Sequence, residues 1–279
     1  MSQNQPAIAV TWQQQHHWIK HSMQALKMLG MLMCALILPL LILCLWWMAF
    51  QQQWLPEQIL PAPEWVWLSA IDLWYSGDLL FHFGISAKRI VYSVLLGSGV
   101  ALALGIWLGL SKTAQHYLRP SLNVLAQFPI IGWIPLLMIF LGIDEALKIV
   151  AISFAVMTPV LFATLKGIQN VPRQVLEVAE VYQYGSGQRF FKVILPASLP
   201  SLISGLRQGI MQAWLALVFV ELLASSEGIG FLMVWGRQLM QMDIVYLGMI
   251  LIGLTGFILD SGLGYIEKLA RFYATRVRA

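Results

Sequence analysis

The chain has 279 residues, of which 59% are apolar and only 11% are charged, and its mean hydropathy is +0.73. Soluble globular proteins carry about 25% charged residues, disordered chains need low hydrophobicity, and disulfide scaffolds need many cysteines, whereas this chain has 2. The composition therefore excludes a soluble enzyme and indicates an all-α polytopic membrane protein. The net charge of +4 is spread along the chain beside apolar runs, so we expect no nucleic-acid partner.

Six apolar runs are long enough to cross a lipid bilayer, because about 20 helical residues span about 30 Å of hydrocarbon. In chain order, the predicted spans cover residues 29–50, 90–110, 122–142, 147–165, 201–224 and 244–265. The first run follows Lys20 and Lys27, as a secretory signal would. It is longer than the apolar core of a signal, which is about 7–15 residues, so we expect it to be retained as a transmembrane helix.

Lys and Arg are divided unevenly between the two sides of these spans. Of the 17 such residues, only Lys88, Arg89, Lys148 and Arg237 fall outside if the N-terminus lies inside. The positive-inside rule places the richer side in the cytoplasm. We therefore expect both termini to be cytoplasmic, with tails at residues 1–28 and 266–279.

The segment at residues 51–87 is predicted to lie on the outer side and is rich in aromatic residues. These are Trp54, Trp65, Trp67, Trp74 and Tyr75. Tryptophan and tyrosine favour the membrane–water interface, so we expect a helix that lies on the outer surface. Contact with a transported substrate is the alternative.

Small residues recur every four positions in the second span, at Gly97, Ala101, Gly105 and Gly109. They share one helix face, and such a face lets another helix approach closely in lipid. Packing within one subunit and packing between subunits would both explain this pattern.

The third span contains Pro129 and Pro135, which should bend or break the helix. Broken helices line the cavities of many transporters. A packed kink with no pathway role is the alternative.

The segment at residues 166–200 is too polar to cross the membrane. Pro172 can open a helix, and residues 174–182 continue it. Gly185 and Gly187 can form a turn before a second short helix at residues 188–194. We expect Pro196 and Pro200 to end that helix before the fifth span. An amphipathic helix–turn–helix on the inner membrane face suits the docking of a cytoplasmic partner.

Several short motifs in this frame resemble the permease subunits of bacterial ABC importers, in the nitrate/sulfonate/taurine/bicarbonate branch. Glu177-Val-Ala179 followed by Val193-Ile-Leu195-Pro196 resembles the EAA signature of that family. Further matches are Leu60-Pro-Ala-Pro63, Gly132-Trp-Ile-Pro135-Leu, Gly205-Leu-Arg207, Glu221 and Gly228-Ile-Gly230. The resemblance covers roughly residues 55–270.

The resemblance implies a type I importer permease fold, with a core domain at residues 88–265 and cytoplasmic coupling helices between the fourth and fifth spans. It also implies the partners: a second permease copy in a homodimer, two cytoplasmic ABC ATPase subunits and a periplasmic substrate-binding protein. The protein would then lie in the bacterial inner membrane and form the pathway for a small anion such as an aliphatic sulfonate, taurine or nitrate.

The residues that the resemblance assigns to ATPase coupling are Glu177, Ala179, Glu180, Gln183, Gly185, Leu195 and Pro196. A charge or a bulky side chain at Ala179 is expected to leave the protein in the membrane but to uncouple ATP hydrolysis from uptake. The chain departs from the family at two positions. It has Gln183 where the family usually has glycine, and Val178 in the middle of the triplet, so we expect Gly185 and Gly187 to supply the turn.

Two acidic side chains lie deepest among the ionisable groups of the predicted spans, where a charge costs about 2.5–3.5 kcal/mol on insertion scales. Glu221 could act in the pathway or a gate, or could be paired structurally, whereas Asp260 is interpreted as a packing or interface group. Trp214, one or two turns from Glu221, could line the pathway or face lipid.

Two other classes of protein are possible. A secondary transporter working without an ATPase would usually show inverted repeats, and none is evident. A membrane-embedded enzyme would need a catalytic cluster, but the five histidines are scattered. The sequence has no G-x-x-x-x-G-K-[ST] phosphate loop, so ATP hydrolysis is expected on a separate chain. We expect no catalytic residues, no metal and no cofactor here.

Overall fold

The computed structural model describes residues 37–276, with side chains through residue 271. Within this range every regular element is helical. The chain divides into two compact units, Met1–Pro63 and Glu64–Ala279. The predicted N-terminal tail and the first residues of the predicted span at 29–50 lie outside the described residues.

The described part of the first unit is one apolar helix and the loop that follows it. Its described residues form the apolar helix Ile37–Gln51, and Ile37 is also the first residue that the structure describes. The turn after Gln51 contains Gln53, which has a φ of 50°, and the Trp54 N–H donates to the Ala49 carbonyl over 3.1 Å. The Trp46 Nε1–H donates to the Pro61 carbonyl over 3.0 Å. This bond folds the loop back toward its own helix.

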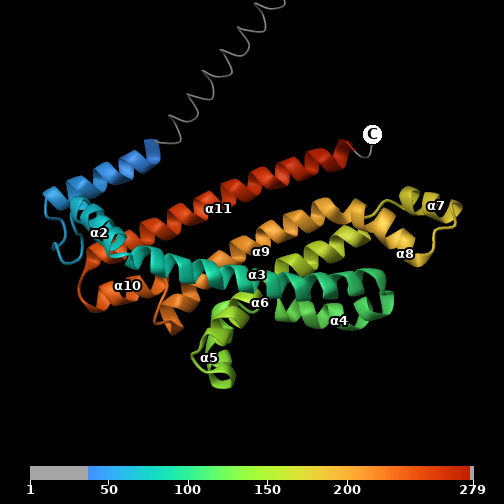
Figure 1. The fold of residues 1–279 in the computed structure, drawn as a ribbon, viewed down its shortest axis with the longest axis horizontal. Coiled ribbons are helices and arrows are strands. Elements are labelled where there is room, and N and C mark those ends of the chain that lie inside the picture. The colour runs from blue at the N-terminus through green and yellow to red at the C-terminus, as the bar shows by residue number, and fades with distance from the viewer. Residues whose placement is uncertain (1–36, 277–279) are drawn as a thin grey trace, which may run out of the picture. The chain divides into compact units, whose positions relative to one another are not determined.

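The second unit contains the remaining helices, which Figure 1 shows as a set of long rods with shorter connecting elements. In chain order they are α2 (Pro63–Ser76), α3 (Asp78–Leu110), α4 (Lys112–Leu125), α5 (Ile130–Leu141), α6 (Glu145–Gln169), α7 (Arg173–Val181), α8 (Ser186–Arg189), the π-helix η1 (Phe190–Ile194), α9 (Leu195–Ala224), α10 (Ile229–Gln238) and α11 (Met242–Arg276). Four stretches in the described range are long and apolar enough to cross a membrane: α3, α6, the run Ser186–Gln238 that contains α9 and α10, and α11. This makes the protein a multi-pass membrane protein.

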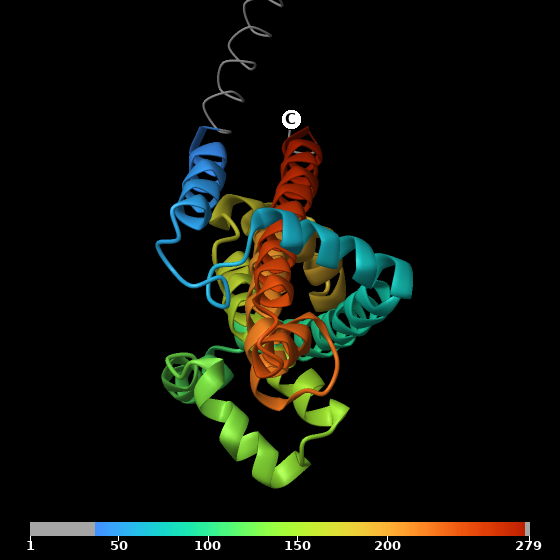
Figure 2. The same cartoon turned by 90° about the vertical axis from the view of Figure 1, so that its left-hand side faces the viewer.

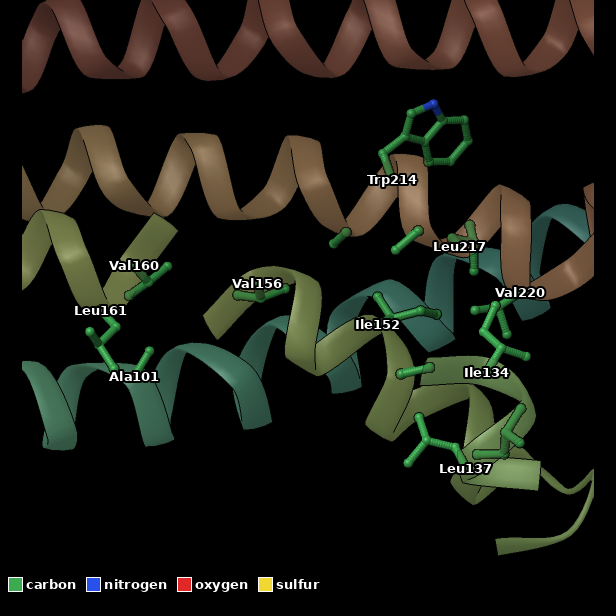
Figure 3. Packing of buried hydrophobic residues seen from close by; sticks show 14 of the residues in the cluster. Ala101, Ile134, Leu137, Ile152, Val156, Val160, Leu161, Trp214, Leu217 and Val220 are labelled. Carbon is green, nitrogen blue, oxygen red and sulfur yellow. The ribbon is translucent and has the colours of Figure 1, made fainter. Parts of the chain in front are cut away.

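The core lies where α6 packs between α3 and α9. Ile152 and Val156 of α6 face Leu217 and Val220 of α9, and all four side chains are almost fully buried (Figure 3). Helices α10 and α11 pack on α9, and Figure 2 shows α11 in red from its end. The three-helix core therefore fixes the positions of the polar side chains described below.

The face of small residues on α3 lies against α6 within this chain. A Cβ atom added at Gly97 would stand 2.6 Å from the Ser153 carbonyl oxygen, and one at Gly105 would stand 2.7 Å from the Thr164 Cβ. Gly109 is equally close to Ile168, and Ala101 is fully buried. Close approach of the two backbones explains why this face lacks larger side chains.

The second predicted span begins too late. Helix α3 starts at Asp78 rather than near residue 90, so the end of the segment at 51–87 belongs to it. Gly77, with a φ of 85°, separates α3 from α2. A glycine is needed there because a left-handed backbone strains other residues. Helix α2 is the helix that the aromatic segment predicted, and its place at the membrane surface remains a prediction.

The third predicted span is broken, as its prolines indicated. Helices α4 and α5 meet at an angle of 95°, and the break ends at Pro129, which caps the start of α5. Pro135 lies inside α5 without breaking it. The predicted run at residues 122–142 therefore straddles two helices, and the pair counts as one candidate span. Six crossings remain a prediction.

The prediction that Pro196 and Pro200 end the second short helix is wrong. Residues 186–224 are helical without interruption through α8, η1 and α9. In the π-turn, the Leu195 N–H donates to the Phe190 carbonyl, and Pro196 follows in the first turn of α9. Proline has no N–H to donate, and it is tolerated in the first turn of a helix, which is where Pro196 lies, directly after this wider turn.

Candidate functional site

The predicted coupling segment forms a helical hairpin between α6 and α9. Helix α7 begins directly after Pro172, as predicted. Glu180 on α7 pairs with Arg189 on α8, with 3.2 Å between Oε1 and Nη1. The Lys192 Nζ lies 5.6 Å from the centre of the Tyr184 ring. These contacts tie the two arms of the hairpin together.

The turn of the hairpin is formed by Gln183. This residue has a φ of 53°, its N–H donates to the Glu180 carbonyl over 2.9 Å, and the Tyr184 N–H donates to the Ala179 carbonyl over 3.0 Å. These paired bonds form a Schellman motif, whose left-handed position is usually glycine. The backbone at position 183 thus has the left-handed conformation that glycine favours, although the residue there is glutamine.

The expectation that Gly185 and Gly187 supply this turn is wrong. Gly185 has a φ of −63° and caps α8, and Gly187 has no positive φ. Neither uses the backbone freedom that distinguishes glycine from other residues.

Most of the residues assigned to coupling are on the surface of the hairpin. Glu177, Glu180, Gln183, Gly185 and Pro196 are exposed, and Leu195 is half-buried. Ala179 differs from them, because it is only 2% exposed, on a helix that packs on η1. A larger side chain at Ala179 would therefore displace α7 within this chain before it reached any partner.

The hairpin also has an apolar surface patch. Its members are Val175, Val178, Val181, Tyr182 and Phe191, and Val181 is 81% exposed. We call this the hairpin patch. Exposed apolar patches with a polar surround are typical of surfaces that bind a protein or a membrane.

Glu221 lies in a buried ion network that joins four helices. Its Oε1 accepts from the Arg89 Nη1 over 2.8 Å and from the Ser86 hydroxyl over 2.7 Å, and its Oε2 accepts from the Gly230 N–H over 2.9 Å. The Glu221 and Arg89 side chains are 1% and 2% exposed. We call this the Glu221 network. Glu221 is thus structurally paired, which was one of the two roles considered from the sequence.

Two further residues complete the charge balance of the network. Glu145 accepts from the Arg89 Nη2 over 2.6 Å and from the Lys148 Nζ over 2.6 Å. Two basic and two acidic side chains therefore meet, which offsets the cost of burying each charge. Nothing in the sequence pattern indicated this pairing, since Arg89 was placed in a segment on the outer side.

The network also holds the loop between α9 and α10. The Arg89 Nη1 donates to the Glu227 carbonyl over 2.7 Å, and the Gly228 N–H donates to the His82 Nδ1 over 3.0 Å. Gly228 has a φ of 109°, and a Cβ atom there would collide with the Glu221 carboxylate. This explains why Gly228 accompanies Glu221 in the resemblance.

A second ion cluster lies where α9 meets the C-terminal half of α11. The Arg207 guanidinium donates to Asp260 over 2.7 Å and to Glu267 over 2.8 Å, and Glu267 also accepts from Arg271 over 2.7 Å. We call this the Arg207 cluster. The Arg207 side chain is 32% exposed, so water reaches this cluster more readily than the Glu221 network. Asp260 is thus a packing group, in line with its interpretation.

Trp214 lies in the core rather than on an exposed face. It is 5% exposed, and a Cβ atom added at Gly256 of α11 would stand 2.9 Å from its Nε1. Figure 3 shows its ring above the helix α9 in the gap toward α11. Neither Trp214 nor Glu221 lines either of the two cavities described next, so their pathway role rests on the sequence alone.

Two cavities open beside α9, and sequence reasoning found neither. The first, of about 480 Å³, lies between the α4–α5 pair and α6, and its lining is mostly apolar. The second, of about 520 Å³, lies between α9 and α11 and includes Ser204, Arg207, Gln208 and Gln212. Pro159 and Gln212 line both cavities, so the two adjoin each other.

Comparison with known proteins identifies the family. A family model described as "Binding-protein-dependent transport system inner membrane component" matches residues 101–272. This range includes the hairpin, the Arg207 cluster and both cavities.

Three curated relatives span most of the chain. The putative aliphatic sulfonates transport permease protein of Bacillus subtilis strain 168 is 36% identical over 85% of this chain and 86% of its own length. The protein of the same description in Escherichia coli K12 is 34% identical over 83% of this chain and 88% of its own length. The taurine transport system permease protein of Escherichia coli K12 is 28% identical over 81% of this chain and 84% of its own length.

A solved structure shares the fold. It is a chain of the MetNI methionine ABC transporter in an inward-facing conformation, with a TM-score of 0.55, 14% identity, and coverage of 66% of this chain and 92% of that one. The match agrees with the predicted permease fold. The chain thus belongs to the family of binding-protein-dependent transport system inner membrane components, in the ABC permease branch that contains these sulfonate and taurine relatives.

Proposed function

We propose that this protein is the transmembrane subunit of an ATP-driven importer and that a separate ATPase binds its α7–α8 hairpin. The observation that carries the proposal is the hairpin patch, an exposed apolar surface on a hairpin braced by the Glu180–Arg189 ion pair. An apolar surface held on a rigid hairpin can transmit force from a bound partner to the helices attached to it. Those helices are α6 and α9, which form the core.

The proposed assembly follows the family. Two copies of this permease form the pathway, two cytoplasmic ATPase subunits bind the two hairpins, and a periplasmic binding protein delivers the substrate. Closure of the ATPase pair would move the hairpins and rock the spans as rigid bodies. The six-span topology with both termini in the cytoplasm belongs to the same proposal and is supported by the distribution of Lys and Arg.

An aliphatic sulfonate is the favoured substrate, ahead of taurine and nitrate. The two sulfonate permeases are 36% and 34% identical to this chain, whereas the taurine permease is 28% identical. The mostly apolar lining of the first cavity also suits an alkyl group better than it suits nitrate.

The experiment is uptake of radiolabelled butanesulfonate in the host cell, with the chromosomal gene replaced by variants. Val178 is 55% exposed in the hairpin patch, so Val178→Asp should abolish uptake while the protein stays in the membrane. Val178→Thr keeps the shape without the charge and should retain most of the uptake. Because Val178 is exposed, this test avoids the internal displacement that a substitution of the buried Ala179 would cause.

Pull-down from the same membranes provides the second readout. The unmodified chain should retain a Walker-type ATPase, and Val178→Asp should lose it. ATP-independent uptake by the purified chain in vesicles would instead identify a secondary transporter, and full uptake by Val178→Asp would refute the role of the hairpin.

A further inference from the structure

Three polar side chains lie at the midpoint of their helices. Gln208 lies 13 residues after the first residue of α9, and Gln212 lies 12 residues before the last. Thr158 lies close to the middle of α6. In the predicted spans, Thr158 and Gln212 lie near the centre of the bilayer and Gln208 lies one helical turn toward the cytoplasmic side. Polar side chains are costly at these depths and usually face a partner or a cavity.

The two glutamine amides have no hydrogen-bond partner within the described part of the chain, and both are exposed. They belong to one face of α9, which continues with Leu215 and Phe219 toward the α10 end of the helix. The opposite face, with Gly209 and Ala213, is buried in the core. An amide without a hydrogen-bond partner is strongly unfavourable in hydrocarbon, so lipid is an unfavourable neighbour for this face.

Both cavities meet at these side chains. Gln212 and Pro159 line the two cavities together, Gln208 lines the second, and Thr158 lines the first. The polar atoms therefore stand at the junction of two spaces that are each large enough for a small organic molecule.

The first cavity is suited to an apolar group. Trp133 and Phe154 lie with ring centres 6.1 Å apart, and Phe128 lies 6.0 Å from Trp133. Met157 and Phe162 extend the same lining. Each methylene group that such a lining removes from water favours binding.

The second cavity is polar, and its charged lining residues are one guanidinium and two carboxylates, of which Glu267 also pairs with Arg271. Its guanidinium, on Arg207, is held by Asp260 and Glu267, so it does not present an unpaired positive charge. Neutral amide donors remain to contact an anion there. Binding by neutral donors is weak enough to allow release, which a transport pathway requires.

We propose that Thr158, Gln208 and Gln212 form a mid-membrane contact site for an organic sulfonate. The sulfonate oxygens accept hydrogen bonds from the two amides and the Thr158 hydroxyl, and the alkyl group lies in the cavity lined by Trp133 and Phe154. The site rests on the proposed function, because only a transport pathway would bring such an anion to the middle of the membrane.

Uptake by variants tests the site in the host cell with its native partners. Gln212→Glu has nearly the same shape but adds a negative charge, so butanesulfonate uptake should fall by about tenfold or more. Gln212→Leu removes the donor without adding charge and should lower uptake by about fivefold. Gln115→Glu makes the same change on α4, outside both cavities, and should leave uptake within about twofold of the unmodified protein.

Thiol labelling tests the permease without relying on the selectivity of its binding protein. Cys34→Ser and Cys44→Ser remove the two native cysteines, and Gln212→Cys then adds one thiol. A sulfonate-bearing methanethiosulfonate reagent should label it about tenfold faster than Phe257→Cys, whose side chain is exposed on α11. Pentanesulfonate should slow the labelling, and nitrate should do so less.

The outcomes separate the site from the proposed function. Absence of ATP-dependent sulfonate uptake by the unmodified protein would refute the proposed substrate. Normal uptake by Gln212→Glu would refute the site alone. Spontaneous disulfide formation between two Gln212→Cys copies, without labelling, would also refute it, since the amides would then pair across a subunit interface.

Discussion

The two ion clusters of the second unit differ in burial, although both join helices through Arg–carboxylate pairs. In the Glu221 network, Arg89 and Glu221 are almost fully buried, and the network pins the backbone of the loop before α10. In the Arg207 cluster, Arg207 and Asp260 are 32% and 51% exposed. Because Arg89 and Glu221 are buried, breaking their ion pair leaves a charge without water. In the Arg207 cluster, water can solvate the separated charges, so breaking a pair costs much less free energy.

Removal of Arg89 should have the largest effect. Arg89→Met would leave Glu221 buried without its cation, and breaking such a pair costs about 3–5 kcal/mol of the free energy of unfolding. Thermal unfolding in detergent should show a large fall in Tm. Lys88→Met is the matched control, because Lys88 is the exposed neighbour of Arg89 on α3. Equal Tm values for the two variants would contradict the bracing role of the network.

Gly228→Ala should have the next largest effect. The φ of 109° at Gly228 is strained for alanine, and the new Cβ would meet the Glu221 carboxylate. We expect a loss of about 2 kcal/mol in the free energy of unfolding. Gly253→Ala serves as the control because nothing lies within 4 Å of its added Cβ, so its Tm should not fall. An unchanged Tm for Gly228→Ala would show that the Glu221 network does not hold the loop as described.

Arg207→Met should lower Tm less than Arg89→Met, and its effect should depend on salt. Exposed ion pairs are screened over about 10 Å at 0.1 M salt, whereas buried pairs are screened much less. The Tm difference between Arg207→Met and the unmodified protein should therefore shrink at high salt, while that for Arg89→Met should persist. The same salt dependence for both variants would remove the distinction between the clusters.

Gln183→Gly should have the smallest effect, and it should be stabilising. Glycine removes the strain of a left-handed backbone at this position, which should raise the free energy of unfolding of the hairpin by about 1 kcal/mol. Limited proteolysis should show slower cleavage between α7 and α8. Gln188→Gly is the same change in helical backbone, where glycine is unfavourable, and it should speed cleavage. Faster cleavage of Gln183→Gly would contradict the assigned turn.

The sequence predicted the helical class and the hairpin because both follow from local patterns. Apolar runs located the bodies of α6, α9 and α11, and Pro172 located the start of α7. The beginning of α3 was missed because Asp78 and His82 look like loop residues, although their helix continues into the apolar run. Pro196 was misread because a π-turn, which has no sequence signature, precedes it.

The polar sites depended on contacts between distant residues. Glu221 and Arg89 are 132 positions apart, and only the packing of α9 on α3 brings them together. Gln208 and Gln212 stood out no more than other polar residues until the fold left them exposed at the middle of α9. Periodicity along a single helix cannot reveal which face will remain without a neighbour.

The unbroken helix at residues 186–224 has a mechanical consequence. At 1.5 Å per residue, it is about 58 Å long. It begins in the hairpin, passes the two glutamines beyond its midpoint and ends at the loop that Arg89 holds. The end of this helix near Glu221 is held by the ion network, whereas its other end, at Ser186, lies at the surface. A force on Ser186 would therefore tilt the helix about Glu221. The resulting displacement is then about a third as large at Gln208 as at Ser186, and a tilt of this one helix changes the width of both cavities at once.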